Sequence, residues 1–221
     1  MTAAALAMSL AACGSPARQE SRAPEPSVAP APPPAAPDSR AVIAAFGDSI
    51  SAGFGLDAGQ SYPDDLQRLI DAAGFRYRVV NMGVSGDTTT DGVERLPSVL
   101  ALKPAVVILE FGGNDGLRGQ PVSAAKQNLA QMIEALRAGG ASVVLAGMTL
   151  PRNYGPDYIH PFDQMYVDLA KQYGLVRIPF ILDGVGGVAA LTQPDGIHPT
   201  AEGARIVASN AMKYLQPILK R

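Results

Sequence analysis

Residues 41–51 read AVIAAFGDSIS, an apolar run that ends at a glycine followed by polar residues. Apolar runs of this length, without alternation, are typical of strands that are covered on both faces of a sheet. The run AVVIL at residues 105–109 has the same character and is richer in β-branched side chains. The two segments therefore predict central strands of a parallel sheet.

Longer amphipathic stretches separate these and further apolar runs. We expect additional strands at residues 77–82, 142–147 and 176–180, and helices at residues 61–73, 122–136, 161–173 and 201–215. Ser61 is a suitable N-cap for the first helix because Asp64 follows three residues later. Strands that alternate with helices within one domain are joined by right-handed crossovers. The order of elements predicts a doubly wound α/β fold with a mostly parallel sheet.

Three glycine-bearing loops follow the first three predicted strands, at residues 47–49, 83–87 and 112–115. In open α/β sheets, ligands bind beyond the carboxyl ends of the strands, where such loops gather. We therefore expect the polar residues of these loops to share one rim of the molecule.

The 221-residue chain divides by composition into three segments. Residues 14–39 are rich in Pro, Ala and Ser and lack apolar runs that could build a core, which is typical of a disordered tether. Residues 40–221 have the composition of one globular domain of ordinary size. Residues 1–13 hold an apolar stretch that is too short to span a bilayer but has the length found in signal peptides.

Cys13 is the only cysteine of the chain, so no internal disulfide can form. The sequence LAACG at residues 10–14 resembles the bacterial lipobox, in which the cysteine becomes the lipidated first residue of the mature protein. This resemblance predicts an exported, periplasmic lipoprotein that is anchored to the membrane through Cys13. The alternative is an ordinary secretory signal, or a leader without lipid.

Composition and motifs argue against several classes of function. The formal net charge is −2 and no run of Lys or Arg occurs, which disfavours a nucleic-acid partner. The glycine-rich loops match neither phosphate-binding motif, G-x-x-x-x-G-K-[ST] or G-x-G-x-x-G. Asp48, Asp195 and His198 are too few ligands for catalytic zinc. We expect no metal or organic cofactor, a small-molecule substrate and a monomer.

The sequence DGIHP at residues 195–199 brings an acid and a histidine into one turn. A serine becomes a good nucleophile when a histidine takes its proton and a carboxylate orients that histidine. The chain has two histidines, and the other one, His160, is expected in a polar loop. Asp195 and His198 could supply the orienting acid and the base. The structural alternative is an Asx turn and cap at the start of the last helix.

Two serines are candidates for the nucleophile. Ser49 follows a buried strand at a predicted corner between strand and helix, where a serine that caps a helix is also common. Ser85 lies in GVSGD at residues 83–87, which departs from the G-x-S-x-G nucleophile pattern because Asp87 stands in place of the second glycine.

Two donors could stabilise the oxyanion of a tetrahedral acyl intermediate. They are the side-chain amide of Asn114 and the backbone N–H of Gly86, both in loops of the shared rim. The structural alternatives are an Asx turn for Asn114 and a turn with positive φ for Gly86.

Four blocks of the sequence together resemble the SGNH (GDSL-type) hydrolases. The blocks are GDSI at residues 47–50, SGDTT at residues 85–89, GGND at residues 112–115 and DGIHP at residues 195–199. Within the superfamily the chain is most similar to the bacterial thioesterase I/protease I/lysophospholipase group, whose members are also called arylesterases. The resemblance implies a flavodoxin-like three-layer α/β/α sandwich.

The same resemblance implies roles for individual residues. Ser49 would be the nucleophile, His198 the base and Asp195 its orienting acid. The backbone N–H groups of Ser49 and Gly86, with the Asn114 side chain, would form the oxyanion hole. Residues 116–121 match a loop that lines the acyl pocket in the family, which makes substrate-binding residues of Gly116, Leu117 and Arg118.

The expected activity is that of a serine hydrolase acting through an acyl-enzyme. Its expected substrates are carboxylic esters or thioesters, such as aryl esters, short to medium acyl esters or lysophospholipids. Two alternatives remain at this point: a carbohydrate O-deacetylase that uses the same residues, and a binding lipoprotein that has kept the scaffold without turnover. An extended apolar groove would favour lipid or thioester substrates, and a shallow polar cleft would favour sugars.

Overall fold

A five-stranded parallel sheet organises the described part of this computed structural model, which comprises residue 2 and residues 38–221. The strands are β1 (Ala41–Gly47), β2 (Tyr77–Gly83), β3 (Val106–Glu110), β4 (Ser142–Ala146) and β5 (Val176–Ile178). Their spatial order is β2-β1-β3-β4-β5, and every neighbouring pair is parallel. After β1 the chain adds β2 on one side of it, and then adds β3, β4 and β5 in turn on the other side.

This strand order confirms the flavodoxin-like arrangement expected from the sequence. The two runs predicted to be central, β1 and β3, pair with each other and are buried almost throughout. β5 ends at Ile178 rather than at residue 180, because Pro179 cannot donate to the ladder.

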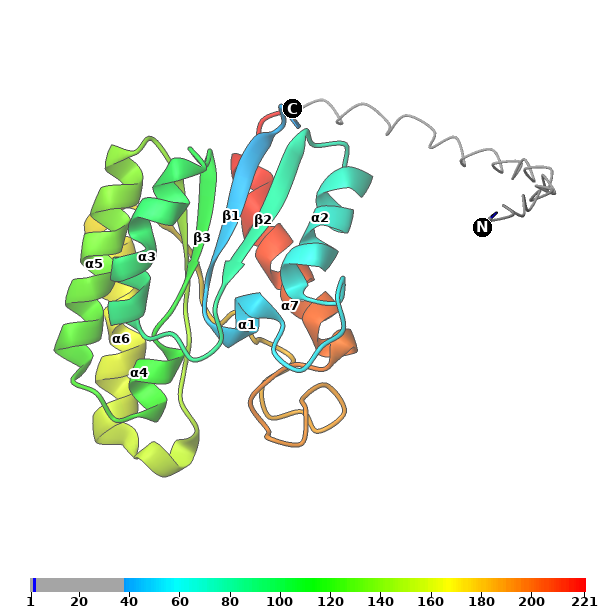
Figure 1. Ribbon diagram of the computed structural model, residues 1–221. Helices are drawn as coiled ribbons and strands as arrows, with labels where there is room; N and C mark the ends of the chain where they lie inside the picture. The colour runs from blue at the N-terminus through cyan, green and yellow to red at the C-terminus, as the bar shows by residue number, and fades with distance from the viewer. Residues whose placement is uncertain (1, 3–37) are drawn as a thin grey trace. The chain divides into compact units, whose positions relative to one another are not determined.

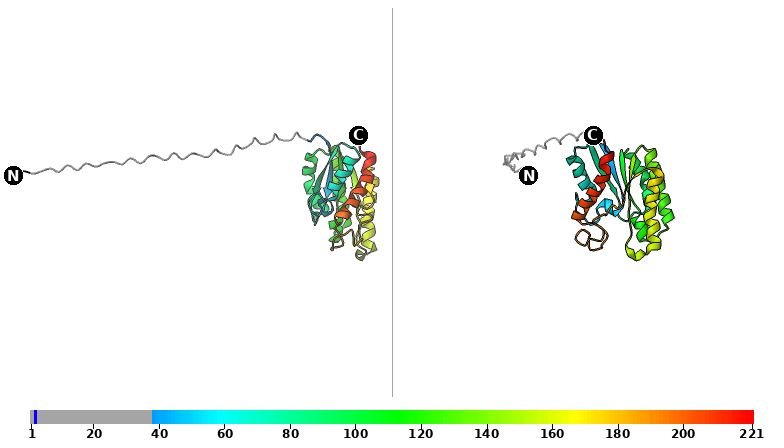
Figure 2. Two further views of the ribbon diagram at one scale, coloured as in Figure 1. Left: turned by 90° about the vertical axis from the view of Figure 1, so that its right-hand side faces the viewer. Right: turned by 180° about the vertical axis from the view of Figure 1, so that it is seen from behind.

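Helices cover both faces of the sheet, which completes the three layers (Figure 1). The helices are α1 (Ser49–Ala52), α2 (Tyr62–Ala72), α3 (Thr89–Ala101), α4 (Gly113–Leu117), α5 (Val122–Ala138), α6 (Pro156–Tyr173) and α7 (Ala201–Leu215). α2 packs against α7 on one face, while α5 packs against α3 and α6 on the other (Figures 1 and 2). Short 3-10 turns occur at Arg152–Tyr154 and Gln216–Ile218.

The start of α2 has the capping box that the sequence predicts. The Ser61 backbone N–H donates to Asp64 Oδ2 at 3.0 Å, and the Asp64 N–H donates to Ser61 Oγ at 3.4 Å. Each side chain thereby satisfies a backbone donor that a helix start leaves without a partner.

Two helices differ from the sequence-based expectation. α3 was not predicted; Gly92 and Pro97 interrupt its sequence, and a Cβ on Gly92 would lie 3.0 Å from the Phe111 ring. α6 begins at Pro156 rather than at residue 161, so His160 is an exposed helical residue and the prediction of a loop there was wrong. Proline at the first helical position is well tolerated because its missing N–H would have no partner there.

The two edges of the sheet have different roles. At the amino ends of the strands, the Lys220 N–H donates to the hydroxyl of Tyr77, so the last residues of the chain return to the start of β2 (Figure 1). The loops predicted to carry the chemistry lie at the carboxyl ends.

None of the helices within the described residues has both the length and the hydropathy needed to cross a membrane. Cys13 and residues 14–37 of the predicted tether lie outside those residues.

Candidate active site

Ser49 is the first residue of α1, directly after the end of β1. Asp48 is the N-cap, and its Oδ1 accepts the N–H of Ile50 at 3.0 Å. Gly53, in the left-handed conformation, ends this four-residue helix. Ser49 is therefore not the capping residue, and the alternative of a helix-capping serine was wrong. The turn from β1 into α1 places the Ser49 hydroxyl at the carboxyl ends of the strands.

Asp195 shapes the turn that carries His198. Its Oδ1 accepts the backbone N–H groups of Ile197 at 2.9 Å and His198 at 3.0 Å, which makes an Asx turn. The cap of α7 is a different residue, Thr200, whose Oγ1 accepts the N–H of Gly203. The Asx turn and the pairing of acid with histidine thus occur together.

A continuous hydrogen-bonded relay joins the two ends of the site. His198 Nε2 lies 2.8 Å from Ser49 Oγ, and His198 Nδ1 lies 2.6 Å from Asp195 Oδ2. Desolvation of the Asp195 carboxyl acts to raise its pKa, but hydrogen bonds from the His198 ring and the two backbone amides outweigh it and lower the pKa to about 2. Asp195 is therefore an anion beside the imidazole at any pH above about 3.

Two backbone amides in the loops at the carboxyl ends of the strands have no acceptor in the described part of the chain. They are the N–H groups of Ser49 and Gly86. The first has no helical partner because it opens α1. Gly86 has φ of +89°, a conformation that favours glycine and turns the loop after β2. Free donors of this kind are what an oxyanion requires.

The Asn114 side chain is engaged rather than free. Its Nδ2 donates to the carbonyl oxygen of Asp87 at 2.9 Å and to Asp48 Oδ2 at 3.2 Å. These bonds tie the loop after β3 to the loops after β1 and β2. The contact with Asp48 is the longer of the two, so it is the one that a substrate oxygen would most readily share.

Arg95 of α3 holds the ends of β1 and β2 and the loop after β2 together. Its guanidinium donates to the carbonyl oxygens of Gly47 at 3.1 Å and Met82 at 2.9 Å, and its Nε pairs with Asp87 at 2.6 Å. The same group lies 5.0 Å from the centre of the Phe46 ring. Sequence reasoning missed Arg95 because α3 itself was not predicted.

Phe54 and Gln193 connect the nucleophile loop with the histidine loop. The rings of Phe54 and His198 lie 4.6 Å apart. Gln193 Nε2 donates to the carbonyl oxygens of Phe54 at 2.7 Å and Pro199 at 2.9 Å. Neither residue was predicted, since glutamine and phenylalanine carry no chemical signature of a site.

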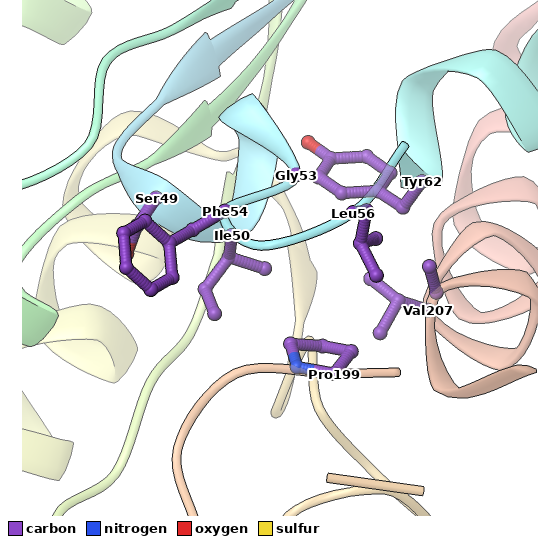
Figure 3. Close-up of a pocket in the computed structure, with 9 residues that line it drawn as sticks. Ser49, Ile50, Gly53, Phe54, Leu56, Tyr62, Pro199 and Val207 are labelled. Atoms are coloured by element: carbon purple, nitrogen blue, oxygen red, sulfur yellow. The ribbon is translucent and has the colours of Figure 1, made fainter. Parts of the chain in front are cut away.

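A small apolar void lies beside Ser49 (Figure 3). Its volume is about 10 Å³, and it is lined by Ser49, Ile50, Gly53, Phe54, Leu56, Tyr62, Pro199, Ala204 and Val207. A space of this size is at the lower limit for one water molecule. The void as it stands has no room for an acyl chain.

A cavity of about 390 Å³ is lined in part by the turn between Asp195 and His198. Its lining comprises Gly113, Leu117, Met148, Thr149, Leu150, Pro151, Arg152, Phe180, Leu182, Gly186, Gly187, Gly196 and Ile197. The lining includes Gly196 and Ile197, which lie in the chain between Asp195 and His198, and Gly113, which precedes Asn114. Its wall is mostly apolar, and its volume is in the range of small-molecule sites.

Only one of the three residues predicted to bind substrate lines this cavity. Leu117 does so. Gly116 instead packs against Leu150 and Phe162, where a Cβ would be 2.5 Å from the nearest atom. Arg118 donates to the carbonyl oxygen of Gly86 at 2.9 Å and so braces the loop that presents the free amide.

The other candidate nucleophile, Ser85, and the other histidine, His160, do not form a hydrogen-bonded pair in the described structure. Ser85 is exposed in its loop and makes no contact with a histidine in the described structure. His160 is exposed on α6, on the opposite face of the sheet from α7. Within residues 38–221, no group of three or more His, Cys, Asp or Glu side chains is arranged to hold a metal ion.

A serine hydroxyl that is hydrogen-bonded to an imidazole, itself hydrogen-bonded to a carboxylate, is suited to acyl transfer, which places the molecule among the serine hydrolases. Comparison with known proteins narrows this class. The chain belongs to the GDSL-like lipase/acylhydrolase family, whose model matches residues 45–206. It is a serine ester hydrolase of the SGNH type.

Relatives and solved structures agree with this assignment. Esterase TesA of Pseudomonas aeruginosa is 48% identical over 174 residues, which cover 78% of this chain and 87% of that protein. Thioesterase 1/protease 1/lysophospholipase L1 of Escherichia coli is 37% identical over 175 residues, covering 79% and 83%. A crystal structure of TesA matches with a TM-score of 0.78 and 46% identity, covering 80% of this chain and 99% of the other.

Proposed function

We propose that Ser49 is the nucleophile, His198 the general base and Asp195 the residue that orients it. The observation that carries the proposal is the 2.8 Å hydrogen bond between Ser49 Oγ and His198 Nε2. Because the other ring nitrogen bonds the Asp195 carboxylate, Nδ1 carries a proton and Nε2 is left free to accept the serine proton.

The reaction then proceeds in two halves. His198 takes the proton of Ser49 as Oγ attacks the ester carbonyl, and the resulting imidazolium returns that proton to the leaving alcohol or thiol. Water next attacks the acyl-enzyme with the same base and acid. Asp195 stays ionised throughout and stabilises the imidazolium.

The oxyanion is bound by the N–H groups of Ser49 and Gly86 and by Asn114 Nδ2. The two backbone donors have no competing acceptor, whereas the side-chain donor exchanges part of its bond to Asp48 for the substrate oxygen. Losing one such donor typically lowers kcat by about 10²–10³. Asn114→Ala should therefore lower kcat with little change in KM.

The acyl chain of the substrate occupies the 390 Å³ cavity. The mostly apolar wall between Gly113 and Ile197 supports short to medium acyl esters, aryl esters, thioesters or lysophospholipids over carbohydrate acetates. The names of the relatives, which include an esterase, a thioesterase, a lysophospholipase and an arylesterase, support the same range. A non-catalytic binding protein would have no use for an intact relay.

The test is a series of p-nitrophenyl esters from acetyl to palmitoyl, assayed with the domain from residue 40 onward and its Ser49→Ala variant. We expect serine-dependent turnover with an optimum above acetyl. An optimum at acetyl would favour the deacetylase alternative. A folded domain without turnover on any of these esters would contradict the proposal.

We also propose that the chain is exported and anchored to the membrane through a lipid on Cys13. The support is the LAACG sequence at residues 10–14 and the Pro-rich segment after it. Two or more acyl chains on one residue give stable anchoring, whereas one chain gives marginal binding. Metabolic labelling with an alkyne fatty acid, compared between the full chain and Cys13→Ala, tests this. Equal labelling of both would overturn it.

A further inference from the structure

Part of the wall of the cavity of about 390 Å³ belongs to a short segment between β3 and α5. This segment, residues 111–120, contains α4 and holds two residues with proposed roles. Asn114 is the side-chain donor of the proposed oxyanion hole, and Leu117 lines the cavity. The contacts that hold this segment in place therefore bear on how an acyl chain is bound.

The end of α4 leaves backbone carbonyl oxygens without partners inside the helix. Two of the carbonyl oxygens in this stretch are bonded by tyrosine hydroxyls instead. Tyr154 Oη donates to the carbonyl oxygen of Leu117 at 2.8 Å, and Tyr158 Oη donates to that of Gln120 at 2.6 Å. Neither carbonyl oxygen accepts another hydrogen bond from the described residues. The backbone position of Leu117 therefore depends on Tyr154.

Tyr154 and Tyr158 begin a row of aromatic side chains that are spaced four residues apart. The row continues with Phe162 and Tyr166, and the centroids of neighbouring rings lie 6.4, 6.5 and 5.6 Å apart. Tyr154 ends the 3-10 turn just before α6, and the other three residues lie within α6. Side chains at this spacing share one face of a helix, so the row is one continuous surface.

The other end of the row holds the start of the same segment. Tyr166 Oη donates to the carbonyl oxygen of Phe111 at 2.9 Å, and a Cβ on Gly116 would lie 2.8 Å from the ring of Phe162. Both of these aromatic side chains are fully buried, whereas the two tyrosines that begin the row are half-buried. The start of the segment is thus fixed in the core, while Leu117 is fixed by a hydrogen bond near the surface.

Tyr154 also belongs to the turn that supplies another part of the cavity wall. Pro151 and Arg152 line the cavity, and Arg152 is the first residue of the 3-10 turn that ends at Tyr154. The bond from Tyr154 to Leu117 therefore joins two parts of the wall that come from different loops. The separation of these two parts limits which acyl chain fits between them.

We propose that Tyr154 is a specificity-determining residue, whose hydroxyl limits the length of the acyl chain by holding Leu117 in the cavity wall. This proposal rests on the proposed function, which places the acyl chain in this cavity. Without the hydroxyl, the end of α4 is free to move away from the turn at residues 151–154, and the cavity accepts longer chains. No hydrogen bond of the described residues joins Tyr154 to Ser49 or His198, so the attack on the ester carbonyl is unaffected.

Tyr154→Phe tests the proposal, because it removes the hydroxyl and keeps the ring against Tyr158. The assay uses p-nitrophenyl esters from acetyl to palmitoyl. The ratio of kcat/KM for the decanoyl ester to that for the acetyl ester should rise about 3–10-fold, mainly through KM, as expected for the loss of one hydrogen bond. The rate on the acetyl ester should stay within about twofold of the wild type, which also reports that the variant is folded.

Two further tyrosines of α6 provide matched controls. Tyr173→Phe removes a hydroxyl that donates to Glu134, at the end of α6 and outside the cavity lining, and should leave the chain-length profile unchanged. Tyr158→Phe removes the donor to Gln120, which belongs to the same segment but does not line the cavity. Its shift should be smaller than that of Tyr154→Phe. An equal shift would assign the effect to the whole segment and overturn the specific role of Tyr154.

Thr149→Trp separates failure of this proposal from failure of the proposed function. Thr149 lines the same cavity, so added bulk there should move the profile toward short chains if the acyl chain occupies the cavity. If Thr149→Trp shifts the profile and Tyr154→Phe leaves it unchanged, or moves it toward short chains, the role of Tyr154 is overturned and the proposed function stands. If neither variant changes the profile, the acyl chain lies elsewhere and that part of the proposed function fails.

Discussion

The ring of Phe54 lies against the ring of His198, with centroids 4.6 Å apart and planes tilted by 40°. The two residues are brought together by Gln193, whose side chain bonds the carbonyl oxygen of Phe54 while its own N–H donates to that of His198. Phe54 is 49% exposed, so its ring contributes little to the core. The contact with His198 stabilises the protonated imidazole, because the face of an aromatic ring attracts a neighbouring cation.

Replacing Phe54 with alanine should slow turnover more than it weakens binding. Loss of an aromatic contact of about 0.5–1.5 kcal/mol in the state with a charged imidazole predicts a fall in kcat of about 3–10-fold. Steady-state kinetics on one p-nitrophenyl ester measure this. The matched control is Val167→Ala, an exposed apolar side chain on α6, which should leave kcat unchanged. An equal loss in both variants would argue for a general effect of exposed apolar residues.

Replacing Asp195 with asparagine should separate geometry from charge. The asparagine oxygen can still accept the N–H groups of Ile197 and His198, so the Asx turn persists. The amide nitrogen then faces His198 Nδ1 and favours the wrong tautomer, and kcat should fall by up to about 10⁴-fold. Circular dichroism should be unchanged. Retention of more than a tenth of the activity would remove Asp195 from its proposed role.

Arg95→Met should destabilise the fold and impair turnover together. The substitution keeps apolar packing on Phe46 but leaves three acceptors, on Gly47, Met82 and Asp87, without their donor. Hydrogen bonds to charged groups contribute about 1.5–3 kcal/mol, so Tm should fall by about 5–10 °C at ~2–4 °C per kcal/mol.

The control for this prediction is Lys126→Met. Lys126 pairs with Asp168, and both side chains are partly exposed, where such ion pairs contribute little to stability. Its Tm should change by no more than about 3 °C, at the slope expected for a domain of this size. Similar shifts in both variants would show that Arg95 is an ordinary surface cation.

Filling the cavity should shorten the acyl chain that the enzyme prefers. Thr149 lines the cavity and is exposed to it, so Thr149→Trp adds bulk without disturbing the core. We expect rates on long-chain p-nitrophenyl esters to fall while the rate on the acetyl ester stays near that of the wild type. Ser209→Trp, on the exposed side of α7, should leave the whole profile unchanged. An unaltered profile in Thr149→Trp would place the acyl chain elsewhere.

The Asp48 carboxyl should make the fold less stable as pH rises. Its pKa is raised from 3.8 to about 6, chiefly by burial, so between these values the folded state binds more protons than the unfolded chain. The free energy of unfolding therefore loses up to roughly 3 kcal/mol from this group between about pH 4 and pH 7. Asp48→Asn should remove that part of the pH dependence while lowering kcat. Urea titrations of both proteins at pH 4, 5, 6 and 7 measure the difference, and parallel curves would contradict it.

Much of the fold is readable from the sequence because its central strands are continuous apolar runs. The runs of β1 and β3 are shorter than most helices and rich in apolar side chains, which favours strands, and the capping box at Ser61 marks the start of α2. α3 was missed although Thr88 and Asp91 form a second capping box and Val93, Leu96 and Val99 have helical spacing. Gly92 and Pro97 weaken the helical signal of this segment. Tertiary packing on the sheet offsets their low helix propensity.

Residues of the site whose chemistry requires a particular residue type could be predicted from the sequence. Residues that belong to the site only because of how the chain packs could not. Ser49, Asp195 and His198, which the structure joins by hydrogen bonds, could be predicted as candidates because few other side chains can perform acyl transfer. Glu110, which is buried and accepts the N–H of Asp48, could have been noticed, since a carboxyl group at the end of an apolar run is costly to bury. The cavity could not be foreseen, because its wall comes from loops distant in sequence whose depth depends on how they pack.

The hydrogen bond between Ser49 and His198 joins residues 149 positions apart in the chain. A contact of such long range forms only after the intervening strands and helices have assembled, because the entropy of closing a long loop must first be offset by other contacts. During refolding from urea, recovery of esterase activity should therefore lag behind recovery of the far-ultraviolet signal of the helices. Enzymatic turnover would then report the final step of folding. The relay forms only in molecules in which both ends of the domain have folded.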